Sequence, residues 1–242
     1  MGISGARVED ESPAAVSSIA GKIRAVTFDV GHTLIEPCIS VGQVYANIAA
    51  AHGVGGLSAV ELDRRFLAVL QARGGAVSTR DDWARIVDNT FAGLVTPLPS
   101  ESFFPELFDH FADAAAWRIY DDVLPTLDEL SQRGIRLGLV SNWDDRLRAL
   151  LAALGLATRF EITVISCEVG SSKPAREIFE AAARRLRLSP TEILHVGDSW
   201  SADVAGAQAA GFRAVQIARG SPAGPDRIAS LRALVDVLSA DL

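Results

Sequence analysis

The chain has 242 residues, which suffices for one large domain or for a core with a smaller insert. Hydrophobic residues make up 49% and charged residues 22%, a balance that argues against a disordered protein. The formal net charge of −7 argues against a general binder of nucleic acid or of anionic membranes, because such binders need basic patches. The two cysteines, Cys38 and Cys167, are far apart and lack metal-ligand spacing, so they indicate free thiols in a reducing compartment.

The N-terminal stretch, residues 1–20, lacks the basic start and the apolar run of a signal peptide. We expect it to form a flexible tail. No apolar run in the sequence approaches the ~18 residues of a membrane span. We therefore expect a cytoplasmic protein without a membrane partner.

The next predicted element is a buried strand at residues 22–29, a short apolar run that is rich in β-forming residues. Residues 38–118 then contain no convincing strand. They contain amphipathic helical patterns at 40–53, 58–74, 80–95 and 101–117. An all-helical block at this place in the chain predicts an inserted cap.

Strands and helices alternate over the rest of the chain. Apolar runs predict strands at residues 134–142, 160–166, 192–198 and 212–217. Apolar spacing of three and four predicts helices at residues 123–134, 144–155, 175–187, 201–211 and 226–238. This alternation predicts an α/β fold with a doubly wound, mostly parallel, Rossmann-like sheet. We expect the core to comprise residues 21–37 and 119–242, and the helical cap to comprise residues 38–118.

Polar residues follow the ends of four predicted strands. In chain order they are Asp29, then Ser141 and Asn142, then Lys173, and finally Asp198 and Asp203. Ligands of open α/β sheets bind at the carboxyl ends of the strands, so these side chains would share one edge. Three carboxylates beside one lysine repel one another unless a cation lies among them, and hard oxygen ligands favour Mg²⁺. Such a site is typical of phosphoryl transfer, which depends on positioning and charge neutralisation.

Each of these segments also has a purely structural interpretation. Asp29 taken alone is more simply the cap of the following turn. Ser141–Asn142 could cap the next helix, Lys173 could be a solvated lysine, and residues 197–203 could be a turn followed by a helix start. The occurrence of all four segments in this order, each at a strand end, favours a functional site.

Four segments resemble the four motifs of the haloacid dehalogenase-like hydrolase superfamily. DVGHTL resembles the first motif, DxDGTL, and LVSN, SSKP and VGDSWSAD resemble the second, third and fourth. The stretches SNWDDRL and GDSWSADVAGAQAAG are similar to the branch that contains haloacid dehalogenase-like hydrolase domain-containing proteins. The resemblance spans roughly residues 22–239, and the helical insert lies where the family's type-1 cap lies.

The resemblance implies a role for each motif residue. Asp29 would be the nucleophile that forms an aspartyl-phosphate, with Ser141 and Lys173 as the other catalytic residues. The residues that would bind the phosphorylated substrate are Thr33, Ser141, Asn142 and Lys173. The groups that would hold Mg²⁺ are Asp29, the backbone carbonyl of Gly31, Asp198 and Asp203.

Position 31 departs from the family pattern, because phosphatases of the family usually carry an acid–base aspartate there and this chain has Gly31. Loss of such a group typically costs about 10²–10⁴ in rate. Three alternatives remain: a proton from His32, an acidic leaving group as in aryl or acyl phosphates, or an acid from the cap or from Asp144 or Asp145. For His32, a one-residue shift in an extended turn predicts a side chain that points elsewhere, which favours a structural or gating role.

Two other activities of the superfamily fit this chain less well. The dehalogenase branch has a bulky residue at the position of Gly31 and no metal requirement, whereas this chain keeps the metal-binding aspartates. Phosphonate hydrolysis needs a cap lysine, and the only lysines are Lys22 and Lys173.

We therefore expect a Mg²⁺-dependent phosphoric monoester hydrolase that acts on a small phosphorylated metabolite, has no nucleic-acid partner and is a monomer or homodimer. The alternative, which Gly31 favours, is a weak or inactive relative that binds a phosphorylated ligand or a protein partner. His195 is predicted to pack within its strand, and Trp143 and Trp200 to flank the mouth of the site. The aromatic residues at 103, 104, 108, 111 and 117 are predicted to form the core of the cap, and as a secondary possibility some of them could line the substrate entrance.

Overall fold

The computed structural model describes residues 22–73, 79–224 and 226–239. The expected tail, residues 1–20, lies outside the described residues. A six-stranded sheet has the order β5-β4-β1-β6-β7-β8, and all its paired strands run parallel. Its strands are β1 (Ala25–Phe28), β4 (Arg136–Ser141), β5 (Ile162–Ile165), β6 (Ile193–Gly197), β7 (Arg213–Ile217) and β8 (Arg227–Ile228).

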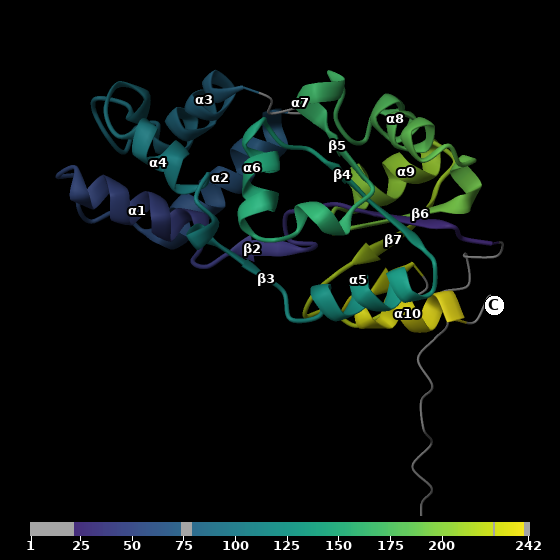
Figure 1. The fold of residues 1–242 in the computed structure, drawn as a ribbon. Helices are drawn as coiled ribbons and strands as arrows, with labels where there is room; N and C mark the ends of the chain where they lie inside the picture. Colours follow the sequence, from purple (N-terminus) through teal and green to yellow (C-terminus); the bar gives the residue numbers. More distant parts are fainter. Residues whose placement is uncertain (1–21, 74–78, 225, 240–242) are drawn as a thin grey trace, which may run out of the picture.

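Helices cover both faces of this sheet (Figure 1). On one face lie α5 (Val123–Gln132) and α10 (Arg232–Ser239), and on the other lie α8 (Arg176–Leu186) and α9 (Gly206–Ala209). Two further helices, α6 (Arg146–Ala153) and α7 (Ser166–Val169), follow β4 and β5. The prediction of a doubly wound, mostly parallel α/β fold is confirmed, as are all five predicted strands of the sheet.

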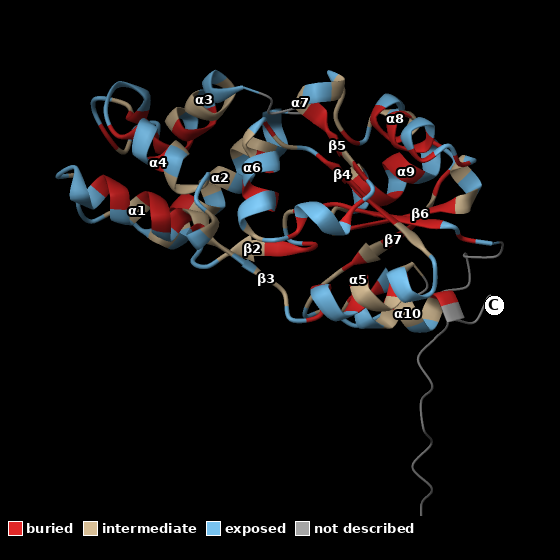
Figure 2. Ribbon diagram, in the orientation of Figure 1, coloured by how far each residue is buried: buried red, intermediate tan, exposed pale blue. Residues whose placement is uncertain are grey.

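Burial on both faces explains why the strands read as continuous apolar runs. All four residues of β1 and all five of β6 are buried. Figure 2 shows buried residues concentrated along the strands and on the inward sides of the flanking helices. The apolar clusters on the two faces are separate, one including Leu127 of α5 and the other Phe179 of α8.

Four helices lie beside the sheet and form a third apolar cluster, which includes Tyr45, Phe91 and Phe103. They are α1 (Val41–Ala51), α2 (Ala59–Arg73), α3 (Arg80–Phe91) and α4 (Phe104–His110), and we call them the cap helices. Two short antiparallel strands, β2 (Ile35–Pro37) and β3 (Trp117–Ile119), connect them to the sheet. The boundaries expected at residues 38 and 118 fall at these strands, and the division into two domains stays a prediction.

Two expectations for residues 38–118 were wrong in detail. β3 begins at Trp117, where no strand was expected, because its pairing partner β2 lies far away in the sequence. The last cap helix is shorter than its apolar pattern, and Pro105 explains where it begins. Proline is tolerated in the first turn of a helix but breaks its interior, so α4 starts at Phe104 rather than near residue 101.

The C-terminal prediction of a helix at residues 226–238 also needs correction. Arg227–Ile228 form strand β8, which pairs with β7, and the helix begins only at Arg232. In the predicted helix at residues 201–211, a π-helix, Trp200–Ala205, precedes α9. Short 3₁₀ helices occupy Pro99–Glu101, Ala114–Ala116, Ala157–Arg159 and Pro190–Glu192. Within the described ranges, the helices are too short or too polar to cross a membrane.

Candidate active site

The carboxylates of Asp29, Asp198 and Asp203 meet at the carboxyl edge of the sheet. Asp29 follows β1, Asp198 follows β6, and Asp203 lies in the π-helix. One carboxylate oxygen from each lies within 4.8 Å of the others. The strands β1 and β6 are paired in parallel, so their ends are adjacent. The structure thus brings together the three carboxylates on which the sequence interpretation depends.

The ammonium of Lys173 bridges two of these carboxylates. Its Nζ donates to Oδ1 of Asp29 at 2.6 Å and to Oδ1 of Asp203 at 2.5 Å, and its side chain is only 2% exposed. The hydroxyl of Ser141, at the end of β4, donates to the same Oδ1 of Asp29 at 3.0 Å. In the described part of the chain, no hydrogen bond reaches Oδ2 of Asp29. One oxygen of this carboxylate is therefore held in place, and the other is free to react.

Asn142 holds the backbone of Lys173 rather than its ammonium. Its side-chain amide donates to the Lys173 carbonyl at 2.9 Å and accepts from the Lys173 N–H at 2.8 Å. This reciprocal pair fixes the loop after β5 against the end of β4. Asn142 also lines the cavity described below. Its contact in this structure positions the lysine, and its expected contact with substrate stays a prediction.

His195 orients Asp203, a role that the sequence analysis missed. The ring Nε2 lies 3.2 Å from Oδ1 of Asp203, and Nδ1 lies 3.0 Å from the hydroxyl of Thr27. Because an ionised carboxylate only accepts, Nε2 carries the proton and Nδ1 accepts from Thr27. Burial lowers the pKa of His195 despite the neighbouring carboxylate, so the ring stays neutral. The histidine was correctly predicted to be buried in its strand, but its hydrogen-bond partner lies in a different element.

Backbone groups complete the environment of Asp203. The N–H of Ser199 donates to Oδ2 at 2.9 Å. A Cβ at Gly197 would lie 2.2 Å from Cγ of Asp203, so only glycine allows this close approach at the end of β6. The carboxylate is therefore immobilised on both oxygens.

The pKa values show that negative charge is in excess at this site. Burial, together with the charges of Asp29 and Asp203, raises the pKa of Asp198 to about 7. Burial also opposes ionisation of Asp203, but the charge of Lys173 and the hydrogen bond from His195 outweigh it and lower the pKa of that carboxyl. Burial likewise opposes the charged form of Lys173, and the attraction of Asp203 and Asp29 outweighs it, so the pKa of Lys173 is raised.

This donor set fits a divalent cation. It offers three clustered carboxylates against a single ammonium, and hard oxygen ligands are those that Mg²⁺ prefers. Within the described residues, the carboxylate of Asp198 is reached by its own backbone N–H and by no donor of another residue, and the carbonyl oxygen of Gly31 accepts no hydrogen bond. Both groups are thus available as ligands, beside the expected ligands Asp29 and Asp203.

Replacing Lys173 by Met should lower the free energy of unfolding by about 3–5 kcal/mol, because two buried carboxylates lose their counter-charge. The measurement is urea unfolding in the presence of a metal chelator. The matched control is Lys22→Met, which removes the chain's other lysine from an exposed position and should change the stability by less than about 0.5 kcal/mol. Equal losses in the two variants would contradict the assignment of Lys173 as the counter-charge of the cluster.

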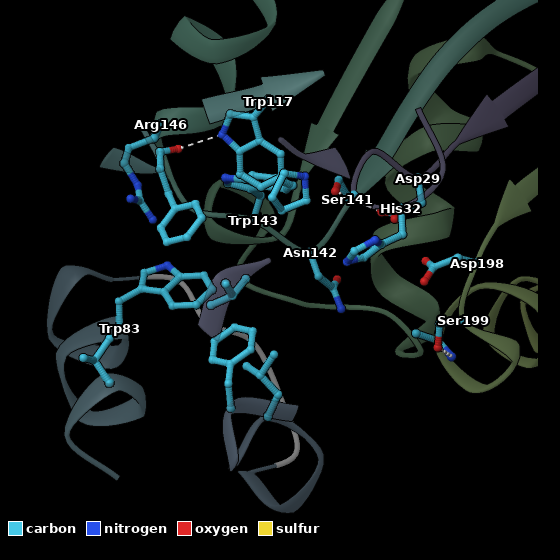
Figure 3. A pocket seen from close by; sticks show the side chains of 18 of the residues that line it. Asp29, His32, Trp83, Trp117, Ser141, Asn142, Trp143, Arg146, Asp198 and Ser199 are labelled. Atoms are coloured by element: carbon cyan, nitrogen blue, oxygen red, sulfur yellow. Dashed lines mark hydrogen bonds between the residues drawn. The ribbon is translucent and has the colours of Figure 1, made fainter. Parts of the chain in front are cut away.

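A cavity of about 320 Å³ opens directly onto these carboxylates (Figure 3). One end is lined by Asp29, Ser141, Lys173, Asp198 and Asp203. The other end is lined by aromatic and aliphatic side chains, mostly from the cap helices. Figure 3 shows Trp83, Trp117 and Trp143 on the side away from Asp29 and Asp198.

The aromatic residues of the cap divide between its core and the cavity. Phe103 and Phe104 are buried in the cap cluster and Phe108 and Phe111 pack against it, as predicted, whereas Trp117 packs against the apolar cluster of the sheet. The side chains of residues 104, 108, 111 and 117 line the cavity, which the sequence analysis left as a secondary possibility. Trp143 lines the cavity as expected, whereas Trp200 is 49% exposed and is not part of its lining. Periodicity could not separate the two roles, because Phe104 both belongs to the cap cluster and lines the cavity.

The turn after Asp29 differs from the expected extended conformation. His32 has a φ of 53°, in the left-handed region that non-glycine residues rarely adopt, and it lines the cavity. Figure 3 shows the side chain of His32 at the cavity, so the expectation that it points away from the site was wrong. Gly31 also lines the cavity, and a Cβ there would make only an ordinary 3.5 Å contact with Cζ3 of Trp143.

Thr33 is placed apart from the other expected substrate contacts. Its side chain is fully buried, its hydroxyl has no hydrogen-bond partner among the residues that the structure describes, and it does not line the cavity. Its expected role as a substrate contact stays a prediction that this placement does not favour.

A charged cluster joins the loop after β4 to the cap helices. The guanidinium of Arg146 donates to both carboxylate oxygens of Asp144, at 2.9 and 2.6 Å, and to the carbonyl of Phe108 at 2.6 Å. The indole Nε1 of Trp83 donates to the same carboxylate at 2.5 Å. The guanidinium also lies 3.6 Å from the ring centroid of Phe108. The only signal in the sequence was that Asp144 and Arg146, two opposite charges, closely follow the second motif. This signal did not predict the partners of the two residues on the cap helices.

Comparison with known proteins agrees with this geometry. A family model described as haloacid dehalogenase-like hydrolase matches residues 23–211. The mouse protein named haloacid dehalogenase-like hydrolase domain-containing protein 3 is 31% identical over 83% of this chain and 84% of its own length. A glyceraldehyde 3-phosphate phosphatase of Methanopyrus kandleri is 32% identical over 82% of this chain and 85% of its own length.

Solved structures show the same relationship. The crystal structure of a HAD phosphatase from Thermococcus onnurineus has a TM-score of 0.65 and 28% sequence identity, and the match covers 89% of this chain and 98% of that one. Dehalogenases are also among the structural neighbours. The fold and the site define a hydrolase with an acidic centre at the carboxyl edge of an α/β sheet. The chain belongs to the haloacid dehalogenase-like hydrolase family.

Proposed function

We propose that this protein is a Mg²⁺-dependent phosphatase that hydrolyses a small phosphorylated compound through an aspartyl-phosphate at Asp29. The observation that carries the proposal is the arrangement of Asp29, with one oxygen fixed by Ser141 and Lys173 and with Asp198 and Asp203 close by. The similarity to a glyceraldehyde 3-phosphate phosphatase and to a HAD phosphatase supports phosphate esters as the substrate class.

The reaction proceeds in two displacements at phosphorus. The free oxygen of Asp29 forms a bond to phosphorus, and the bond from phosphorus to the leaving oxygen breaks with its electron pair. Water then attacks the phosphorus of the aspartyl-phosphate, which releases inorganic phosphate and restores the carboxylate. Lys173 and Ser141 donate hydrogen bonds at this position and stabilise the negative charge on the phosphoryl oxygens.

The Mg²⁺ ligands in this proposal are Asp29, Asp198, Asp203 and the carbonyl of Gly31. When bound, Mg²⁺ neutralises charge on the phosphoryl group and helps to orient it. His195 and the N–H of Ser199 hold Asp203 in the orientation that such a site needs.

Hydrolysis of acetyl phosphate and of p-nitrophenyl phosphate tests this function. Both substrates have leaving groups that need little protonation, so the missing carboxyl at position 31 matters least for them. We expect phosphate release with Mg²⁺ and a loss of at least about 100-fold when a chelator is added, with recovery when excess Mg²⁺ is restored. A rate that is independent of the chelator would reject the metal-dependent mechanism.

The absence of a side chain at position 31 favours one alternative, a family member that binds phosphate groups without turnover. In that case neither substrate is hydrolysed under any metal condition. Inorganic phosphate would then still bind, and it would raise the melting temperature of the Mg²⁺-loaded protein.

A further inference from the structure

We propose that the cavity beside the carboxylates binds the aromatic ring of an aryl phosphate, a phosphate ester of a phenolic hydroxyl. This deepens the proposed function and rests on it, because it assumes that the phosphate lies at Asp29. The whole cavity of about 320 Å³, including the end beside the carboxylates, is roughly twice the size of one that holds a benzene molecule, so it accommodates an aromatic ring together with the phosphate group.

The wall contributed by the cap helices is apolar except for the hydroxyl of Tyr45 and the indole N–H of Trp83. Every lining residue of α1 to α4, from Val41 to Phe108, is aliphatic or aromatic. A sugar or a polyol bound against such a wall would lose its hydrogen bonds to water without replacement, which costs free energy. A planar apolar ring loses nothing of this kind and gains from being buried.

At the end of the cavity away from the carboxylates, the polar side-chain atoms of Trp83, Trp117 and Arg146 already make hydrogen bonds within the protein. The indole of Trp83 donates to Asp144, and that of Trp117 donates to the carbonyl of Phe111 at 3.2 Å. The guanidinium of Arg146 donates hydrogen bonds to Asp144 and to the carbonyl of Phe108. No cation is left at this end to pair with a second acidic group of a substrate, among the lining residues that the structure describes.

Tyr45 is the remaining polar exception among the cap residues of the lining. Its hydroxyl has no hydrogen-bond partner within the described ranges, and burial strongly raises its pKa, so it stays protonated. One hydroxyl satisfies a single ring substituent, such as a second hydroxyl on the aromatic ring. It does not satisfy the several hydroxyls of a sugar.

The aromatic rings themselves favour another ring as their neighbour. Trp117 lies against Trp143 with centroids 5.3 Å apart and planes tilted by 54°, and Phe111 contacts Trp117 edge to face at 6.0 Å. Together they form an aromatic corner in the lining of the cavity, in which Trp143 lies beside Gly31. Edge-to-face contacts with a bound ring stabilise it beyond the effect of burying its apolar area.

The chemistry at position 31 points to the same substrate class independently. Gly31 supplies no proton to the leaving oxygen, so a readily displaced oxygen reacts best. A phenol loses its proton at a pKa of about 10, several units below water. In the reaction the bond from phosphorus to the phenolic oxygen breaks, the phenolate leaves with the electron pair, and it takes a proton from solvent.

Binding to Asp29→Asn separates this inference from the question of turnover, because that variant holds substrate without hydrolysing it. Three of the four tryptophans line the cavity, so their fluorescence reports on its occupation. With Mg²⁺ present, we expect the Kd of phenyl phosphate to be at least tenfold lower than that of glycerol 3-phosphate, an alkyl ester of similar charge.

Two variants of α2, made in the Asp29→Asn protein, provide a matched pair. Leu70 lines the cavity, and Leu67 on the same helix is 55% exposed. We expect Leu70→Asn to raise the Kd of phenyl phosphate about tenfold and Leu67→Asn to leave it unchanged. If Leu70→Asn and Leu67→Asn have the same melting temperature, the loss of affinity in Leu70→Asn comes from the cavity and not from a loss of folding.

The outcomes distinguish the two proposals. Equal Kd values for phenyl phosphate and glycerol 3-phosphate, or equal effects of the two leucine variants, overturn the ring site, and hydrolysis of acetyl phosphate then still supports the proposed function. Tight and selective binding of phenyl phosphate without turnover by the unmodified protein supports the ring site and rejects the phosphatase.

Discussion

Asp29→Asn should reduce the hydrolysis of acetyl phosphate and p-nitrophenyl phosphate by at least about 10⁴-fold, because an amide oxygen does not form the covalent intermediate. The substitution keeps an oxygen that accepts the hydrogen bonds now made by Ser141 and Lys173, so the fold should be preserved. The measurement is kcat/KM from phosphate release at saturating Mg²⁺. Circular dichroism and the melting temperature check that the variant is folded.

The control for this substitution is Asp121→Asn, which makes the same chemical change at an exposed position outside the cavity lining. We expect its kcat/KM to equal that of the unmodified protein. If Asp29→Asn keeps more than about one tenth of the activity, Asp29 is not the nucleophile, and the proposed mechanism is wrong.

Gly31→Asp should raise the hydrolysis of alkyl phosphates, such as glycerol 3-phosphate, by about 10²-fold or more. The structure accommodates the change, because the new Cβ would make only a van der Waals contact with Trp143. The apolar ring of Trp143 and the nearby charge of Asp29 should raise the pKa of the added carboxyl. This favours the protonated form, which can donate its proton to the leaving oxygen. The gain should be smaller for phenyl phosphate, whose phenolate leaves more easily.

Gly31→Asn is the matched control, since it has nearly the same shape but carries no proton to donate. An equal rate in the Asp and Asn variants would contradict the view that a missing acid limits the reaction. The group to test next would then be His32, which lines the cavity beside Gly31. A loss of alkyl-phosphate turnover in His32→Gln would identify it as the proton donor.

The sheet and its acidic edge could be predicted from sequence because their signals are local. Each strand is a short apolar run, and residues such as Asp29 and Ser141 stand directly at strand ends. Parallel pairing then places those ends together, so no knowledge of distant contacts was needed. The convergence of Asp198 and Asp203 with Asp29 follows from the same rule.

The parts that escaped prediction depend on contacts between distant residues. His195 looked like one more apolar-strand position, and its bonds to Thr27 and Asp203 arise only when three elements meet. The strand β8 forms because β7 offers a free edge, although residues 226–238 have helical spacing. The bond between Trp83 and Asp144 joins two elements whose sequence patterns carry no information about each other.

That bond has a consequence for how the molecule handles its ligand. Asp144 lies in the loop after β4, between Ser141 at the strand end and Arg146 at the start of α6, and the pair Asp144 and Arg146 holds α3 through Trp83 and α4 through Phe108. Separation of these helices from the sheet would break charge-assisted hydrogen bonds of Asp144 and Arg146, next to the residues that are proposed to orient the phosphoryl group. In the proposed mechanism, uncovering the cavity and loosening the segment next to Ser141 would therefore occur together.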